Sequence, residues 1–140
     1  MFLSSVDGRE LNPSNTAVDF TVSLPSRVKL WNLEGSRWKV ALSDVSISGI
    51  HSLSSSVNVM CDIVSSSLIR NSYQPILRSF PAQTLASASL FLPYYMPLNT
   101  SSIERIRIYL LDDKLQPLLL PPGESEVVLS CSLHFLRNKD

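Results

Sequence analysis

The chain has 140 residues, 44% of them hydrophobic and 17% charged, and its twelve Lys and Arg residues balance its twelve Asp and Glu residues. This length and composition predict one folded domain over residues 1–140 and exclude general disorder. Zero net charge offers no field that would attract a phosphate backbone, so we expect no direct nucleic-acid binding. No stretch resembles a signal peptide or a membrane span. We therefore expect a soluble protein made in the cytosol or nucleus.

Apolar and polar residues alternate with period two in the first half of the chain, and no segment shows helical spacing. A short strand is predicted over 1–5. The strand predicted over 18–24 turns one face inward, and Pro25 should end it because proline lacks an amide donor. After a turn at Glu34-Gly35, the strand over 37–47 should direct a second set of side chains toward the core. The inward residues are Phe20, Val22 and Leu24 in the first of these strands and Trp38, Val40 and Leu42 in the second.

The second half of the chain repeats the pattern. A strand over 57–64 is followed by weaker ones over 74–80 and 89–98, where prolines indicate edge positions or strand ends. Two long strands are predicted over 103–110 and 127–135. Their inward residues are Ile106, Ile108 and Leu110 in one, and Val127, Leu129, Cys131, Leu133 and Phe135 in the other. The sequence therefore predicts an all-β fold of about eight antiparallel strands, a single jelly-roll β-sandwich.

The candidates for chemistry all have simpler structural interpretations. Asp112 and Asp113 directly follow a predicted strand, where Asp commonly starts a turn, and too few other acids lie near them for a metal site. His51 and His134 have no second histidine close by, which disfavours a metal-binding cupin. Cys61 and Cys131 lie in strand-like stretches without CxxC spacing, so both should be buried free thiols. No catalytic motif occurs. We therefore expect no enzyme, catalytic residue, cofactor or metal.

Two proline-rich connections contain more apolar residues than one subunit should bury. Leu118, Leu119 and Leu120 precede Pro121 and Pro122, and three successive leucines cannot all face inward from one extended strand. The other connection contributes Tyr94, Tyr95 and Met96, residue types that are enriched at interfaces, although core packing explains them equally well. These eight residues are the candidate interface set.

The order of the segments resembles a known family. "DFTVSLPSRVKLWNLEGSRWKVALSDVSI" is similar to the start of the penton, or minor capsid, proteins of Polinton-like and adintovirus-like double-stranded DNA viruses. "VMCDIVSSSLIRNSYQPILRSFP", "YYMPLNTSSIERIRIYLLDDKLQPL" and "VVLSCSLHFLRN" resemble later segments of that family, in the same order. The likeness runs from about Asp19 to Arg137. Two features depart from it: only "SGIHSLSSSVN" stands where relatives have a long insertion, and Lys114 replaces a glycine after the acidic pair.

The resemblance implies a capsid subunit of the virion, assembled in the host nucleus or cytoplasm. Five copies would form a penton at the vertices of an icosahedral shell built from a double jelly-roll major capsid protein, and a spike or fibre protein is a further possible partner. A compact variant can also sit elsewhere in the shell. The alternatives are a jelly-roll attachment or cement module on the particle surface, trimeric or monomeric, and a small cupin-like enzyme.

Overall fold

The computed structural model of the chain describes residues 1–6, 13–29, 36–48, 56–81, 89–90, 92–118 and 128–139, and all regular structure in these ranges is β. The strands are β1 Phe2–Ser4, β2 Asp19–Lys29, β3 Ser36–Ser48, β4 Ser56–Cys61, β5 Ser67–Ile69, β6 Ser72–Gln74, β7 Ile76–Pro81, β8 Ser89–Leu90, β9 Met96–Pro97, β10 Ser102–Leu111 and β11 Val128–Lys139. The predicted all-β class is confirmed.

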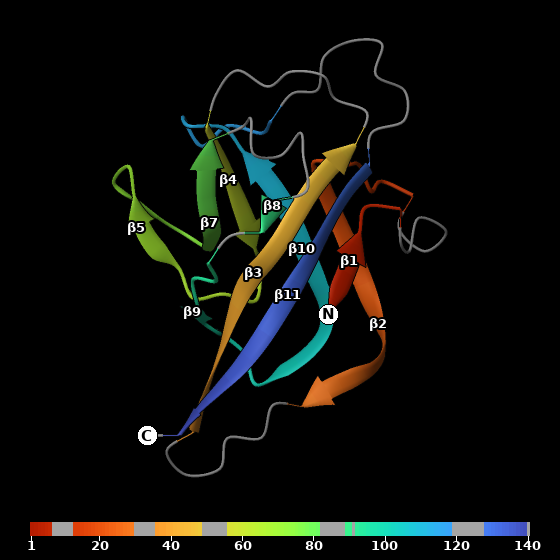
Figure 1. Cartoon of the computed structure of the whole chain (residues 1–140), viewed down its shortest axis with the longest axis vertical. Coiled ribbons are helices and arrows are strands. Elements are labelled where there is room, and N and C mark those ends of the chain that lie inside the picture. The colour runs from red at the N-terminus through yellow and green to blue at the C-terminus, as the bar shows by residue number, and fades with distance from the viewer. Residues whose placement is uncertain are drawn as a thin grey trace.

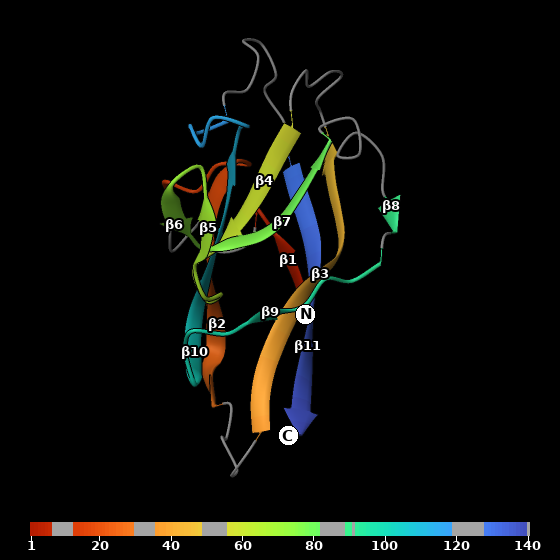
Figure 2. The ribbon, with the colours of Figure 1, turned by 90° about the vertical axis from the view of Figure 1, so that its left-hand side faces the viewer.

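Two antiparallel sheets pack face to face (Figures 1 and 2). One has the order β1-β11-β3-β8, with β9 also paired to β3, and the other has the order β2-β10-β4-β7. We count β8 and β9 as one interrupted strand and leave aside the separate β5–β6 hairpin. In both sheets a strand from late in the chain, β11 or β10, then lies between two strands from its first half. This interleaving is the jelly-roll arrangement, and it confirms the predicted fold.

The core lies between the sheets and is formed by the inward faces predicted from the alternation. Ile106, Ile108 and Leu110 of β10 are buried, with Arg107 and Tyr109 turned toward the outer face. The other predicted inward residues are also buried or partly buried against this core: Phe20, Val22 and Leu24 of β2, Trp38, Val40 and Leu42 of β3, and Leu129, Cys131, Leu133 and Phe135 of β11. Val127 and the turn at Glu34-Gly35 lie outside the described residues.

A β-bulge in β3 reverses which residues of that strand face inward. Leu42 pairs with Leu133 and Asp44 pairs with Ser132, so Ser43 is an extra residue on β3. Its hydroxyl donates to the Ser132 carbonyl at 3.0 Å. Before the bulge the even-numbered residues face the core, whereas after it the buried residues are Val45 and Ile47.

Two sequence predictions for individual strands were wrong. Pro25 does not end β2, which continues to Lys29, because the ladder with β10 is irregular there. Ser23 pairs with Arg105 and Val28 with Ile103, so Pro25 lies inside a bulge where its missing donor costs no ladder bond. The single strand expected over 89–98 is instead two strands of two residues each, β8 and β9, both on β3. Pro93 lies in the extended connection between them.

Candidate contact surface

Residues 96–99 close one side of the sandwich by bonding to β3 of one sheet and to the segment that follows β4 of the other. On one side, the amide of Leu98 donates to the Trp38 carbonyl of β3 at 3.2 Å. On the other, the amide of Ser65, just after β4, donates to the Pro97 carbonyl at 2.8 Å. This double attachment fixes the position of the preceding residues 92–95, which include the tyrosines singled out from the sequence.

The three candidate residues of this connection differ in exposure. Tyr94 is 64% exposed, whereas Tyr95 is half-buried and Met96 is half-buried against the core. Leu92, which the sequence analysis did not single out, is 86% exposed. Among the described residues of this connection, Leu92 and Tyr94 are therefore the large hydrophobic side chains that are most exposed.

Tyr95 lies over the outer face of the first sheet. Val40 of β3 pairs with Met96, and Ala41 pairs with His134 of β11, so Tyr95, Ala41 and His134 lie side by side across the sheet. The Tyr95 hydroxyl is 2.6 Å from Nδ1 of His134, and the two rings meet edge to face. Ala41 is fully buried although it faces away from the core, because Tyr95 crosses it.

The β5–β6 hairpin was not predicted from the sequence. Its strands are joined by Arg70 and Asn71, which both have positive φ, 46° and 62°, as a two-residue type I′ turn requires. Leu68 and Tyr73 are directly opposite each other in this ladder and are 64% and 73% exposed. Asn71 is a residue type that favours this turn, but Arg70 is not, and each strand is too short to show a clear alternation.

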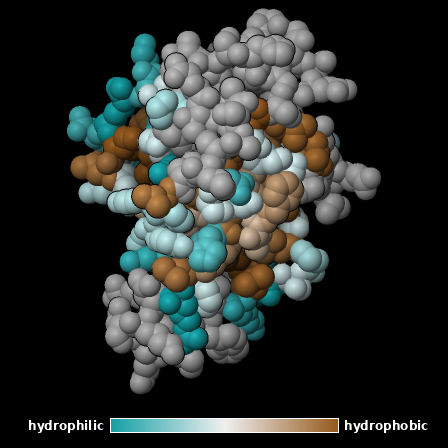
Figure 3. All heavy atoms as spheres, viewed as in Figure 1, coloured by the Kyte–Doolittle hydropathy of each residue, from teal (hydrophilic) through white to brown (hydrophobic). Residues whose placement is uncertain are grey.

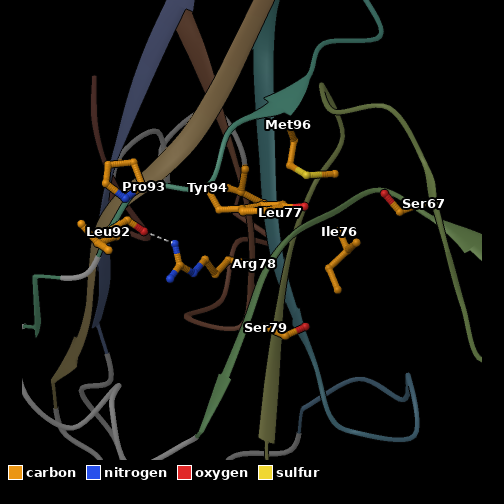
Figure 4. Close-up of a pocket in the computed structure, with 9 residues that line it drawn as sticks. All are labelled: Ser67, Ile76, Leu77, Arg78, Ser79, Leu92, Pro93, Tyr94 and Met96. Atoms are coloured by element: carbon orange, nitrogen blue, oxygen red, sulfur yellow. Dashed lines mark hydrogen bonds between the residues drawn. The ribbon is translucent and has the colours of Figure 1, made fainter.

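An open cavity of about 490 Å³ lies beside the hairpin (Figure 4). One wall is formed by β7 and the other by the 92–96 connection, with Ser67 of β5 at the rim. The Arg78 guanidinium spans the cavity and donates to the carbonyl of Leu92. Leu92 and Tyr94 line this cavity, and the exposed Leu68 and Tyr73 belong to the hairpin beside it. These four residues are called the hairpin edge below.

The opposite edge of the sandwich carries a second apolar group. Met1, Phe2 and Val6 in and around β1 are 43%, 64% and 43% exposed, and they are called the β1 edge below. The β1 strand is paired along its length with β11, and the nitrogen of Met1 donates to the Leu133 carbonyl at 2.7 Å. In Figure 3 hydrophobic colour is visible at both edges, over β5 on the left and over β1 on the right.

In the second proline-rich connection, residues 118–122, the structure describes Leu118. Leu118 is only 7% exposed and packs in the core, because its amide donates to the Leu110 carbonyl at 3.2 Å and turns the chain back over β10. Its side chain is thus buried within its own subunit. Leu119, Leu120, Pro121 and Pro122 lie outside the described residues.

The acidic pair forms a turn, as predicted. Oδ1 of Asp112 accepts the amides of Lys114 and Gln116, both at 2.9 Å, and the Leu115 amide donates to the Asp112 carbonyl at 3.1 Å. Asp113 is exposed beside it. The Asp112 carboxylate is therefore used to hold the loop between β10 and Leu118.

The outer face of β2 and β10 is charged but internally paired. Arg107 forms a bidentate ion pair with Asp19, at 2.9 and 2.8 Å, and its guanidinium lies 4.3 Å from the centre of the Tyr109 ring. The hydrogen bonds that the Arg107 guanidinium donates to the Asp19 carboxylate raise the pKa of Arg107. Arg27 is paired with Glu104 on the same face. These pairs give a mixed surface rather than a continuous basic one.

Both cysteines are free and buried in the core, as predicted. Burial raises the pKa of each thiol to about 12. Cys61 comes from the sheet of β4 and Cys131 from that of β11, so the two thiols lie in opposite layers of the sandwich. Neither has the lowered pKa of a reactive thiol.

Within the described ranges, no three His, Cys, Asp or Glu side chains are grouped as a metal site would require. His134 is exposed on β11, as its alternation predicted, whereas His51 is outside those ranges. In the same part of the chain, no helix has the length and apolar character needed to cross a membrane.

Comparison with known proteins does not assign the chain to a family. No model of a protein family matches the sequence, and a search of curated proteins finds no significant similarity.

Proposed function

We propose that the chain is a structural subunit of an icosahedral viral capsid, a penton-like single jelly-roll protein that acts by assembly. The observation that carries this proposal is the strand order, β1-β11-β3-β8 against β2-β10-β4-β7, which makes the chain one complete jelly roll. The ordered resemblance of residues 19–137 to penton proteins supports it independently. Fold alone does not specify function, so the number of copies that assemble is what distinguishes the penton from its alternatives.

The exposed side chains also support an assembling protein. Leu68, Tyr73, Leu92 and Tyr94 are large side chains exposed on one side of the sandwich, and exposed aromatic and apolar residues of this kind are common at contact sites. The charged groups of the outer β2–β10 face are largely paired with each other. A shell subunit requires lateral apolar contacts and no catalytic group.

Five copies around a vertex would contact the double jelly-roll major capsid protein at their outer rim and could carry a spike or fibre protein. The test is to express the chain alone and together with such a major capsid protein. Native mass spectrometry and electron microscopy should show a closed ring of five, and the chain should be found at particle vertices. A chain that stays strictly monomeric and never joins particles contradicts the proposal.

The same images test the alternative of an attachment or cement module. Three-fold particles bound on the capsid surface, away from the vertices, would favour that function over the penton. A bound stoichiometric metal that is lost on replacement of His51 or His134 would instead favour a cupin-like enzyme.

A further inference from the structure

We infer that the two apolar edges of the sandwich are the two halves of one interface, in which the β1 edge of one copy packs against the hairpin edge of the next. This inference rests on the proposed assembly function and specifies the surfaces that assemble. The partner that it names is a second copy of this chain.

The hairpin edge is unusual for a surface that stays in water. The β5–β6 hairpin is a separate two-stranded sheet, and such a hairpin is only marginally stable by itself. Its central pair, Leu68 and Tyr73, nevertheless points outward. Together with Leu92 and Tyr94, this pair exposes on the order of 500 Å² of side chain. A partner that covers this edge would stabilise the hairpin.

The cavity beside the hairpin sets the shape of that partner. It is open to solvent, and its walls include Ile76, Leu77 and Met96. The Arg78 guanidinium crosses it to the Leu92 carbonyl and offers a cation to the face of an aromatic ring. Its volume of about 490 Å³ exceeds that of one side chain. A projecting aromatic residue with an apolar neighbour therefore fits it best.

The β1 edge presents such a group. Phe2 is 64% exposed, and Met1 and Val6 flank it at 43% each. Its backbone is held by pairing of Phe2 with Ser132, Leu3 with Cys131 and Ser4 with Ser130. Because this segment is already ordered, its insertion into a neighbouring cavity would lose little conformational entropy.

The sheet order places the two edges on opposite sides of the molecule. β1 and β2 are the last strands of the two sheets on one side, and β7 and β8 are the last strands on the other. Two different patches on opposite sides give a heterologous contact, which closes into a ring when the rotation between copies allows. Each copy would then cover both of its apolar edges at once.

The combined area is adequate for a stable contact. The exposed side chains of the two edges supply on the order of 800 Å² of apolar surface, and standard interfaces bury about 1,200–2,000 Å² in total with a polar rim around the apolar centre. The surrounding backbone and polar side chains of β1, β5 and β6 would supply that rim.

The experiment uses two variants of the untagged full chain, each altered at one edge. Phe2→Asp puts a charge at the β1 edge, and Leu68→Asp with Tyr73→Asp does so at the hairpin edge. All three side chains are exposed, so both variants should keep the fold, which circular dichroism checks. Leu136→Asp is the matched control, because Leu136 is 37% exposed on β11 but belongs to neither edge.

Native mass spectrometry should show that wild type and Leu136→Asp assemble while each edge variant alone is monomeric. An equal mixture of the two edge variants should give a dimer of one copy of each and nothing larger, because only one intact edge of each kind remains. An isologous contact, in which both copies use the same patch, cannot produce this result.

The outcomes separate the inference from the function that it rests on. If wild type assembles and either edge variant assembles equally well, or if the mixture gives no dimer, the edge pairing is wrong while the capsid role stands. If wild type is monomeric in solution but joins particles, the pairing between copies is again contradicted. A wild type that neither assembles nor joins particles contradicts both proposals.

Discussion

The Tyr95 hydroxyl lies 2.6 Å from Nδ1 of His134, and between the two residues the buried Ala41 occupies the outer face of β3. This contact joins the connection after β8 to the last strand of the chain. It holds Tyr95 over the sheet and thereby leaves its neighbour Tyr94 exposed beside the cavity.

Tyr95→Phe should destabilise the fold by about 1 kcal/mol, because it removes this hydrogen bond and keeps the ring over Ala41. Tyr94→Phe is the matched control, since Tyr94 is 64% exposed, and it should change the free energy of unfolding by less than about 0.5 kcal/mol. Urea unfolding measures both values. Equal effects of the two substitutions would show that the hydroxyl of Tyr95 does not contribute to stability.

Deletion of Ser43 should be tolerated. Ser43 is the extra residue of the β3 bulge, so without it Leu42 and Val45 would still face the core in a regular alternation. The expected loss is about 1 kcal/mol, mainly from the hydrogen bond to Ser132. Urea unfolding of the purified variant provides the measurement.

Deletion of Ser46 is the control, because it removes the same residue type from the same strand. It moves Ile47, now 3% exposed, to the outer face and should cost about 3 kcal/mol or more. If the Ser43 deletion is as damaging as the Ser46 deletion, the bulge is not at Ser43.

Compared with wild type, Asp62→Asn should gain more free energy of unfolding at neutral pH than at acid pH. Desolvation raises the pKa of Asp62, against the hydrogen bond from the Arg107 amide, which lowers it. The folded state therefore holds this proton more tightly than the unfolded state. The stability that the folded state gains by holding this proton is fully present below pH 3.8, the ordinary pKa of Asp. It is lost as the pH rises through the folded-state pKa.

The free energies of unfolding of wild type and Asp62→Asn, measured from pH 3 to pH 7, should diverge in favour of the variant as pH rises. Asp62→Ala removes the acceptor for the Arg107 amide as well as the charge, so it should be less stable than Asp62→Asn throughout. A difference between wild type and Asp62→Asn that does not change with pH contradicts this account.

Cys61 and Cys131 should react with iodoacetamide only when the chain unfolds. Their pKa values of about 12 leave about a thousandfold less thiolate than at the ordinary value of 9.0, and both side chains are also inaccessible. Labelling at pH 8 followed by mass spectrometry should show slow modification of the native protein and rapid modification in urea. Rapid labelling of either thiol in the native protein would show that it is not buried.

Several features could be predicted from the sequence because they depend on neighbouring residues. The alternation of Ile106, Ile108 and Leu110 fixes the inward face of β10 whatever strand lies next to it, and Asp112 builds its turn with amides only two and four residues away. The prediction of an edge strand over 74–80, made from the proline at its start, was also correct, since β7 is the last strand of its sheet.

Other features depended on distant partners. Pro25 ends a strand by the local rule, but the bulge opposite Glu104 lets β2 continue. The burial of Leu118 depends on its bond to Leu110, and the leucine run alone does not show which residue turns inward. The β5–β6 hairpin has three residues in each strand, too few for a periodic signal.

The sequence by itself determined the all-β class, the residues that face the core and the buried state of both cysteines, because side-chain alternation is a property of each strand alone. Only the tertiary structure decided which strands are neighbours and which form the edges. Met1 bonds to Leu133 over a separation of 132 residues, and no local pattern encodes such a pairing. The candidate contact surface consists of edges, so its position became apparent only when both sheets were assembled.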